Sequence, residues 1–148
     1  MAAKNKKALR NYEVKDTLEA GVVLTGAEVK SVKDNRVNIS DAYVKEMSGE
    51  LWLINADIAR YKFSGDENYD STRSRKLLVK RGEMESLVSK TKQGGLTIIP
   101  LKIYVNRGLV KVLIGIGRGR KRHEKKLRDK ERDLERSLHR EKRKHMVE

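Results

Sequence analysis

The sequence predicts a mainly β protein with short helices, in which about six strands form a closed or nearly closed antiparallel barrel. Three observations support this fold class. Short β-branched or alternating apolar runs are separated by turn signals, and only two short segments have helical apolar spacing. The helices are also too few and too short to connect the strands of a parallel sheet. Apolar residues become sparse after Ile116, and a basic C-terminal tail follows.

Residues 1–10 and 11–24 form a basic arm followed by the first predicted strand. The arm has few apolar side chains, so we expect it to be disordered or to order only when it docks. The strand prediction rests on Tyr12, Val14 and the β-branched run near its end. Gly21 interrupts that run, which indicates a bulge or a close backbone approach.

A short helix is predicted after this strand. Thr25 and Glu28 have the spacing of a capping box, in which each side chain accepts from a free backbone N–H group at the start of a helix. Val29 and Val32 are three residues apart, so both face the core if the helix continues to about Lys33.

The next predicted element is a hairpin. Residues 39–47 and 51–54 flank a compact turn signal at residues 48–49. Trp52 lies in the second strand and is the best single candidate for a core residue. Residues 60–74 are mostly polar and predict a long loop, and loops of that length in a small domain are often functional or disordered.

A strand, a helix and a second hairpin complete the body. Residues 75–80 are extended, and residues 82–93 carry an apolar stripe with helical spacing before a glycine pair. Residues 96–116 contain two strands joined by a turn at residues 106–108. Pro100 has no backbone N–H group, so it marks a sheet edge or a bulge.

These elements divide the chain into a basic N-terminal arm (1–10), an OB-fold-like barrel (11–117) and a basic C-terminal tail (118–148). The 148 residues carry a net charge of +14, which favours a polyanionic partner such as a nucleic acid. The lack of cysteine excludes disulfides and thiolate metal sites. No apolar run approaches the roughly 20 residues of a membrane span or forms a signal peptide, so we expect a cytoplasmic protein with no membrane partner.

No group of residues predicts catalysis. The three histidines, His123, His139 and His145, all lie in the tail, where no core would hold them in place. The sequence has no phosphate-binding loop or dinucleotide fingerprint, and Asp66 and Asp70 lack the remaining ligands of a calcium loop. We therefore expect no enzyme activity, no bound metal and no cofactor.

The tail carries the strongest binding signal. If it is helical, six basic residues recur every three or four positions and form one face. They are Lys125, Arg128, Arg132, Arg136, Arg140 and Arg143. A solvated charged helix or coil is the alternative, because acidic residues lie between them. The glycine-punctuated basic run at residues 118–122 favours RNA, and we expect a tail that is disordered when free and helical when bound.

The body carries smaller basic clusters at residues 5–10, at Lys30 and Lys33, and on both sides of residues 77–79. Each cluster alone fits a solvating charge as well as an RNA contact, but together they would line one face of a barrel. Aromatic residues make up only 5% of the chain, which favours recognition of a folded RNA by shape over base stacking.

Five sequence blocks carry a family resemblance. They are Asn5–Tyr12 (NKKALRNY), Glu19–Ser31 (EAGVVLTGAEVKS), Asn38–Tyr43 (NISDAY), Arg75–Leu78 (RKLL) and Pro100–Tyr104 (PLKIY). They resemble the bacterial SsrA-binding protein family, also called small protein B. The resemblance implies an OB-type barrel that binds the transfer-RNA-like part of transfer-messenger RNA (tmRNA) and brings it to stalled ribosomes. It also implies that the tail enters the decoding centre and the empty messenger channel, where small-subunit RNA is the partner.

The resemblance and the basic clusters together give two sets of expected contact residues. The expected tmRNA contacts are Asn5, Lys6, Tyr12, Glu19, Lys30, Arg75, Lys76, Leu78 and Lys80. The expected decoding-centre and messenger-channel contacts are Gly119, Lys121, His123, Lys125, Lys126, Arg128, Arg132 and Arg136. Glu19 is unusual for an RNA surface: it accepts from base or ribose donors, or it pairs with a nearby lysine.

Three positions depart from the family pattern. Lys80 stands where the family usually has His or Asn, and Glu124 stands where it has Asp. Lys126 stands where the family has Arg, whose planar fork lysine lacks. We expect a monomeric RNA adaptor. The alternative is a basic ribosomal or ribosome-associated structural protein.

Overall fold

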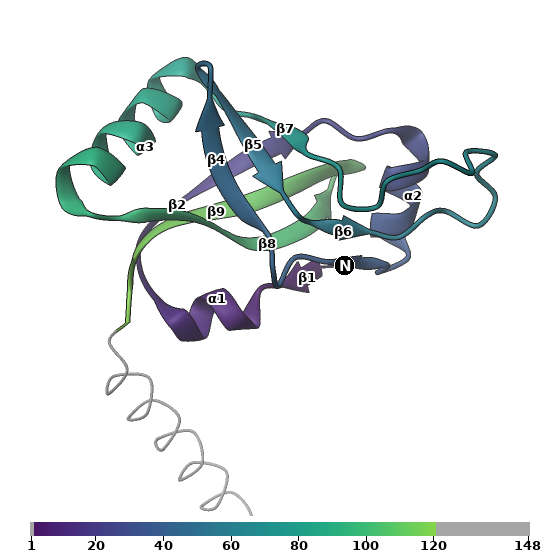
Figure 1. Ribbon diagram of the computed structural model, residues 1–148, viewed down its shortest axis with the longest axis horizontal. Helices are drawn as coiled ribbons and strands as arrows, with labels where there is room; N and C mark the ends of the chain where they lie inside the picture. The colour runs from purple at the N-terminus through teal and green to yellow at the C-terminus, as the bar shows by residue number, and fades with distance from the viewer. Residues whose placement is uncertain (1, 121–148) are drawn as a thin grey trace, which may run out of the picture.

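The computed structural model describes residues 2–120, and within this range the chain forms nine strands and three helices (Figure 1). In chain order they are β1 (Ala2–Lys4), α1 (Lys6–Asn11), β2 (Tyr12–Val22), α2 (Gly26–Lys33), β3 (Val37–Asn38), β4 (Tyr43–Met47), β5 (Glu50–Ile54), β6 (Asp57–Ile58), β7 (Arg75–Leu78), α3 (Arg81–Gly94), β8 (Thr97–Asn106) and β9 (Leu109–Gly119). The six strands predicted from the sequence correspond to β2, β4, β5, β7, β8 and β9, and α2 and α3 lie at their predicted positions.

Seven strands form one antiparallel sheet in the order β1-β8-β9-β2-β7-β5-β4, and β3 pairs with β6 in a second, two-stranded sheet. The large sheet curls on itself, because β4 at one edge contacts β8 near the other edge. In Figure 1, α3 and α2 lie at opposite ends of this curled sheet, and the loop between β6 and β7 extends beyond α2. The predicted mainly β fold class with short helices is confirmed.

Two tight hairpin turns fix the strand register. The φ angles are +53° at Ser48 and +78° at Gly49, between β4 and β5, and +51° at Arg107 and +77° at Gly108, between β8 and β9. Positive φ at both central residues is typical of a type I′ turn, whose twist matches that of the flanking strands. Ser48 and Arg107 therefore hold a conformation that costs a residue with a Cβ atom some free energy, and the strand pairing on each side offsets it.

Both predicted helices have the expected ends. The Oγ1 atom of Thr25 accepts from the N–H group of Glu28 at 3.2 Å, and the Glu28 carboxylate accepts from the N–H group of Thr25 at 2.9 Å. This is the predicted capping box of α2, and Val32 on the same helix is buried in the core. Helix α3 ends at Gly95, whose φ of +62° makes it a left-handed cap.

The predictions for Pro100 and Gly21 each left two alternatives. The register of β8 against β9 shifts just after Pro100, and β8 lies between β1 and β9, so Pro100 marks a bulge and not a sheet edge. The bulge in β2 lies between Val14 and Asp16. Gly21 instead allows a close approach, because a Cβ atom there would lie 3.3 Å from the Cβ atom of Leu78.

Trp52 is not the core residue that the sequence predicted. Leu51 and Leu53 are 1% and 0% exposed, whereas Trp52 between them is only partly buried. Successive side chains of a strand point to opposite faces. The register of β5 points the two leucines inward, so the prediction for Trp52 was wrong and its ring lies on the outer face of the sheet.

Of the two alternatives for residues 1–10, the disordered arm was wrong for those that the structure describes, which are docked on the body. Strand β1 pairs with β8, and α1 is capped at its start by Asn5, which is 1% exposed. The Asn5 side chain accepts from the N–H group of Ala8 at 3.0 Å and donates to the carbonyl of Pro100 at 2.9 Å. Backbone pairing and this polar cap order the segment, and neither depends on the apolar content from which disorder was predicted.

At the other end of the body, β9 runs to Gly119, two residues beyond the predicted boundary at residue 117. The N–H group of Arg120 then donates to the carbonyl of Asn11 at 2.8 Å, so the described chain ends beside α1. Gly117 is buried where β9 pairs with β2 next to the bulge, and a Cβ atom there would lie 2.7 Å from the carbonyl oxygen of Glu13. Close strand packing therefore explains this glycine.

Candidate nucleic-acid interface

The side of the sheet that faces away from the core presents a continuous row of side chains across four strands. Tyr104 on β8 lies opposite Lys111 on β9, Lys111 lies opposite Gly21 on β2, and Gly21 lies opposite Leu78 on β7. Residues directly opposite on paired strands share one face of a sheet. The neighbouring row of Ile103, Val112 and Ala20 is buried, so the row that contains Gly21 points outward.

Alternate residues extend this surface to neighbouring rows. Leu113 lies opposite both Lys102 and Glu19, and Trp52 lies opposite both Lys76 and Lys45. We call the whole surface the outer sheet face. Its members are Glu19, Gly21, Lys45, Trp52, Lys76, Leu78, Lys102, Tyr104, Lys111 and Leu113.

Glu19 on this face is held by an aromatic hydroxyl. The Tyr104 hydroxyl donates to the Glu19 carboxylate across β9, so the pairing with a lysine that the sequence left open is replaced by pairing with a tyrosine. Burial raises the pKa of Tyr104 to about 12, and the hydrogen bond to Glu19 and its negative charge act in the same direction. Tyr104 therefore stays a neutral donor at physiological pH and orients a carboxylate that keeps acceptor capacity.

The lysines on the outer sheet face differ in their surroundings. The Nζ atom of Lys102 lies 5.1 Å from the centre of the Tyr104 ring, a cation–π contact that leaves its charge available to an anion. Lys76 forms an ion pair with Glu50 at 3.2 Å, with about two fifths of each side chain exposed. Exposed pairs of this kind are weak, so a phosphate can compete with Glu50 for Lys76.

A hollow at one end of the outer sheet face joins it to α3. Lys76 and Leu78 line it from β7, and Arg81 and Met84 line it from the helix. Leu78 is 52% exposed. Lys80 is exposed immediately before α3, where its backbone N–H group donates to Glu83 at 3.3 Å. Glu50 and Glu85 also line the hollow, where they pair with Lys76 and Arg81. The hollow therefore offers apolar contact and paired charges, and Lys80 lies next to it.

Arg75 was expected at the RNA surface, but it is 0% exposed. Its guanidinium donates to the Glu28 carboxylate at 2.6 and 2.9 Å and to the carbonyl of Ala56 at 2.6 Å. Arg73 also donates to Glu28. Burial by itself raises the pKa of Glu28, but hydrogen bonds from Arg73, the Thr25 backbone and Arg75 prevail and lower it to about 2. The assignment of Arg75 to the RNA surface is corrected, because it is the counter-ion of a buried carboxylate.

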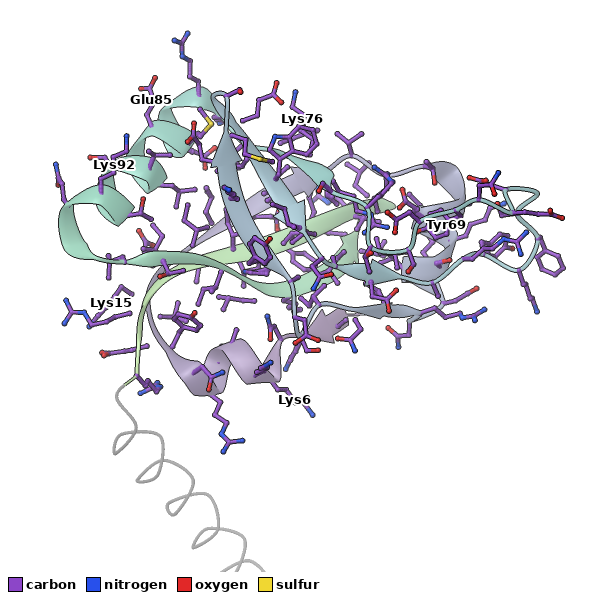
Figure 2. The ribbon with its side chains drawn as sticks, viewed as in Figure 1. Lys6, Lys15, Tyr69, Lys76, Glu85 and Lys92 are labelled. Carbon is purple, nitrogen blue, oxygen red and sulfur yellow. The ribbon has the colours of Figure 1, made fainter. Side chains whose placement is uncertain are left out.

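The remaining predicted contacts do not form one patch. Glu19, Lys76 and Leu78 lie together on the outer sheet face, with Lys80 next to them. Lys6 lies on α1, and Figure 2 shows it far from Lys76. Asn5 is buried in its own hydrogen bonds and is removed from the contact set for that reason.

Two further members of that set, Tyr12 and Lys30, lie elsewhere. Tyr12 pairs with Gly119 at the end of β9, and Lys30 is exposed on α2. Gly119 is described, but the other predicted ribosome contacts and the predicted conformation of the tail fall outside residues 2–120. Those contacts are Lys121, His123, Lys125, Lys126, Arg128, Arg132 and Arg136.

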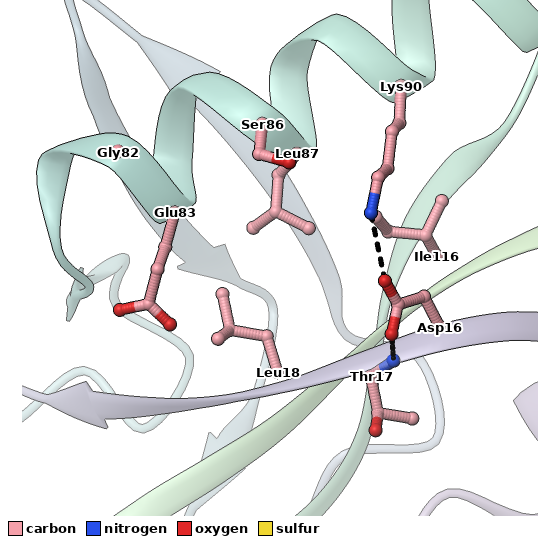
Figure 3. A pocket seen from close by; sticks show the side chains of 9 residues that line it. All are labelled: Asp16, Thr17, Leu18, Gly82, Glu83, Ser86, Leu87, Lys90 and Ile116. Atoms are coloured by element: carbon pink, nitrogen blue, oxygen red, sulfur yellow. Dashed lines mark hydrogen bonds and ion pairs between the residues drawn. The ribbon is translucent and has the colours of Figure 1, made fainter.

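In a second hollow, between α3 and strands β2 and β9, the charged side chains Lys90 and Asp16 pair with each other (Figure 3). Leu18, Leu87 and Ile116 form its apolar floor, and Lys90 bridges to Asp16 at 2.9 Å. The hydrogen bond from Lys90 lowers the pKa of the Asp16 carboxyl, and the Thr17 backbone N–H group acts in the same direction. This hollow is the seam by which α3 packs on the sheet, and we assign no ligand to it.

Sequence reasoning identified only three of the ten members of the outer sheet face, Glu19, Lys76 and Leu78. The members that were not predicted as contacts are Gly21, Lys45, Trp52, Lys102, Tyr104, Lys111 and Leu113. The alternation of exposed and buried residues in residues 102–113 contained the signal, because Ile103 and Val112 are apolar between lysines. Which strands lie side by side, however, follows only from the sheet order.

Within residues 2–120, no group of three or more His, Cys, Asp or Glu side chains is placed to hold a metal ion. No helix in the same range is long and apolar enough to cross a membrane. The features that the fold does present are a curled antiparallel sheet, a lysine-rich outer face and aromatic rings among the lysines. Together they define a nucleic-acid-binding protein of the antiparallel-barrel class.

Comparison with known proteins gives the family. Residues 2–144 match the family model described as SmpB protein. The chain is 53% identical over 122 residues to the SsrA-binding protein of Chlamydia caviae, which covers 82% of this chain and 81% of that protein. It is 48% identical over 125 residues to the SsrA-binding protein of Oceanobacillus iheyensis, with 84% and 81% covered. The chain belongs to the SmpB family of SsrA-binding proteins.

A solved structure supports the same assignment. It is described as "tmRNA-SmpB: a journey to the center of the bacterial ribosome", and its matching chain superposes on this one with a TM-score of 0.68 at 43% sequence identity. The match covers 82% of this chain and 85% of that one. The resemblance noted in the sequence is therefore confirmed.

Proposed function

We propose that this chain is an RNA-binding adaptor of trans-translation, which binds the transfer-RNA-like domain of tmRNA and delivers it to stalled ribosomes. Its relatives are SsrA-binding proteins, and the solved structure it matches concerns tmRNA, SmpB and the bacterial ribosome. The adaptor acts as a monomer in the cytoplasm, without catalysis or a cofactor. Its partners are tmRNA and the small-subunit RNA of the ribosome.

The observation that carries this proposal is the outer sheet face, where Glu19 and Leu78 flank Gly21. Gly21 lies opposite Lys111 on one side and Leu78 on the other, and because it has no side chain the Leu78 side chain packs closely against it. A ribose or base can pack on the exposed part of Leu78, which is 52% exposed. Glu19 then accepts from a ribose or base donor, while surrounding lysines contact phosphates, which fix register and orientation.

Each class of side chain on this face has a separate role. Lys102 and Lys111 supply positive charge, which gives affinity that falls with salt. Trp52 and Leu78 supply apolar area for a ring or a ribose. Lys80 contacts a phosphate, where other members of the family would offer a side chain able to contact a base edge.

The tail contacts belong to the same proposal. The described chain ends at Arg120, whose N–H group is bonded to the carbonyl of Asn11 in α1 and not to the outer sheet face. We place Lys121, His123 and Lys125 at the decoding centre and the later arginines in the messenger channel. His123 has a ring that can stack on a base there.

Truncation after Arg120 tests this division of labour, because it leaves every described strand intact. The expected result is nearly unchanged affinity for a transcript of the transfer-RNA-like domain and loss of peptide tagging in a reconstituted translation system. Leu78→Glu in the full chain is the reciprocal variant, because it places a charge beside Gly21 and should weaken the transcript's binding. Equal loss of affinity in both variants would contradict the proposal.

The alternative, a structural ribosomal protein, makes a different prediction. Such a protein stays on ribosomes in stoichiometric amount through a high-salt wash, whereas an adaptor bound mainly by phosphate contacts is released. Quantifying the chain on ribosomes washed at increasing salt separates the two.

A further inference from the structure

The loop between β6 and β7 (residues 59–74) has a fixed base. Arg75 lies at its C-terminal end, and its guanidinium donates to the carbonyl of Ser71 at 2.9 Å as well as to Glu28 on α2. The Tyr69 hydroxyl lies 2.8 Å from the carbonyl oxygen of Ile58, at the other end of the loop. Because these groups are buried or partly buried, the two ends of the loop are held together and against α2.

The tip of the loop is closed by its own hydrogen bonds. The Arg60 guanidinium donates to the carbonyl oxygens of Ser64 and Asp66, each at 2.9 Å. The N–H group of Ser64 donates to the carbonyl of Tyr61 at 2.9 Å, which closes a turn over the residues between them. The tip therefore presents a defined shape even though it extends beyond α2 (Figure 1).

An aromatic and basic cluster lies on this tip. Phe63 is 74% exposed, the largest value among the exposed large apolar side chains of residues 2–120. Its ring meets the Tyr61 ring edge-on, with centroids 5.4 Å apart and an interplanar angle of 70°. Lysine Nζ atoms lie beside both rings, that of Lys62 at 4.9 Å from the Phe63 centroid and that of Lys30 at 5.3 Å from the Tyr61 centroid. We call these four residues the loop-tip cluster.

The two lysines keep their charge available. Neither Lys30 nor Lys62 forms an ion pair with a residue in the described range. The nearby carboxylates of Asp66 and Asp70 instead accept from N–H groups of their own turns, at 3.1 and 3.0 Å. An apolar protein groove could cover Phe63, but it would leave two lysines that need anions. A nucleotide supplies both a flat ring and a phosphate.

We propose that the loop-tip cluster is a stacking site for an unpaired RNA base, with Phe63 as the stacking ring and Lys62 as the phosphate contact. Tyr61 supports the Phe63 ring, and Lys30 adds positive charge beside the Tyr61 ring. None of the four residues belongs to the outer sheet face, so this is a second contact on the body. The sequence argued against stacking because aromatic residues are few, but the loop gathers two of them at one point.

The experiment is ultraviolet crosslinking of the full chain to an unstructured 12-nucleotide RNA, followed by mass spectrometry of the peptide that contains Tyr61 and Phe63. The RNA is kept below the dissociation constant and the yield is read at Tyr61, which every variant keeps, so that the yield follows the affinity of the site. Phe63→Ala should reduce the yield at least about five-fold, the lower end of the contribution of one stacked base. Phe63→Tyr keeps an aromatic ring at this position and should retain the crosslink yield.

Leu109→Ala is the matched control, because Leu109 is an exposed apolar side chain without a ring, 61% exposed at the start of β9 and outside the loop. It should leave the crosslink unchanged. In a plot of the logarithm of crosslink yield against the logarithm of salt concentration, Lys62→Gln should make the slope less steep by about 0.7. This is the value for one phosphate contact to a single strand. A yield that is the same in Phe63→Ala and the native chain overturns the proposal.

Two further arms identify the source of the base and use a transcript of the transfer-RNA-like domain and intact ribosomes. A crosslink at the loop tip with either RNA supports the site and names its source. Absence of a crosslink with all three RNAs overturns the proposed stacking site. If Phe63→Ala then still weakens ribosome binding, the loop-tip cluster contacts a protein and not RNA. Failure of the stacking site would leave the proposed adaptor function standing, because Leu78→Glu and the tail truncation test that function separately.

Discussion

Replacing Glu28 with glutamine tests whether one buried carboxylate holds three parts of the fold together. Glu28 accepts from Arg73 and Arg75, which end the β6–β7 loop, and from the backbone of Thr25 at the start of α2. Its side chain is 1% exposed and that of Arg75 is 0% exposed. The substituted amide would keep the volume and the capping reach but leave the arginine charge without a counter-ion.

The magnitude follows from the pKa of Glu28, which falls from 4.5 to about 2 on folding. A carboxyl whose pKa is lower in the folded state stabilises the protein above its unfolded pKa, and the stabilisation is lost as pH falls through the folded pKa. At about 1.4 kcal/mol for each pKa unit, the contribution near pH 7 is about 3 kcal/mol. Removing one partner of a buried ion pair costs a similar amount, and the melting temperature should fall on the order of 10 °C.

The assay is urea unfolding of the native chain and of Glu28→Gln at pH 7 and at intervals down to pH 3. The difference in unfolding free energy should be largest at pH 7 and should shrink as pH falls from about 4.5 toward 2. Glu50→Gln is the matched control, since it breaks the exposed pair with Lys76 and should cost less than about 1 kcal/mol. A cost below about 1 kcal/mol for Glu28→Gln at pH 7, or a cost independent of pH, would refute the reasoning.

Two further predictions concern the sheet. Tyr104→Phe removes the donor to Glu19 and should weaken tmRNA binding several-fold at unchanged melting temperature, whereas a fall in melting temperature with intact binding would contradict the positioning role. In the native chain, absorbance titration should show one tyrosine ionising near pH 12, above the ordinary value of 10. Gly117→Ala should destabilise the protein by more than about 1 kcal/mol, because the methyl group would meet the Glu13 carbonyl oxygen at 2.7 Å. A Cβ atom at Gly119 would lie 4.0 Å from its nearest neighbour, so Gly119→Ala should be tolerated. Equal melting temperatures for the two variants would show that β2 and β9 do not pack tightly at Gly117.

Local sequence signals predicted the secondary structure well, for reasons that can be named. The Thr25–Glu28 capping box depends on hydrogen bonds that span three residues, and the turns at Ser48 and Arg107 depend on the glycine that follows each of them. The bulge after Pro100 follows from a missing N–H group. In all these cases the physical cause lies within a few residues of its effect.

Signals that identify a residue type without its partner were less reliable. Arg75 looks like a surface cation in the sequence, because its counter-ion lies 47 positions earlier at Glu28. Asn5 looks like part of a polar arm, although it spans 95 positions to the carbonyl of Pro100. Trp52 was predicted to be buried because it is large, but the register of β5 decides which face each of its residues takes.

Local patterns and overall composition were enough to predict the mainly β class, the positions of two helices, the basic character of the chain and its family. Folding brought Lys102, Tyr104 and Lys111 onto one face with Glu19 and Leu78, and it decided that arrangement. It also decided that Phe63 meets Tyr61 at an exposed tip and that Arg75 is buried. The physical reason is that these relations depend on which strands pair and in what register, and pairing joins segments that lie far apart in the chain.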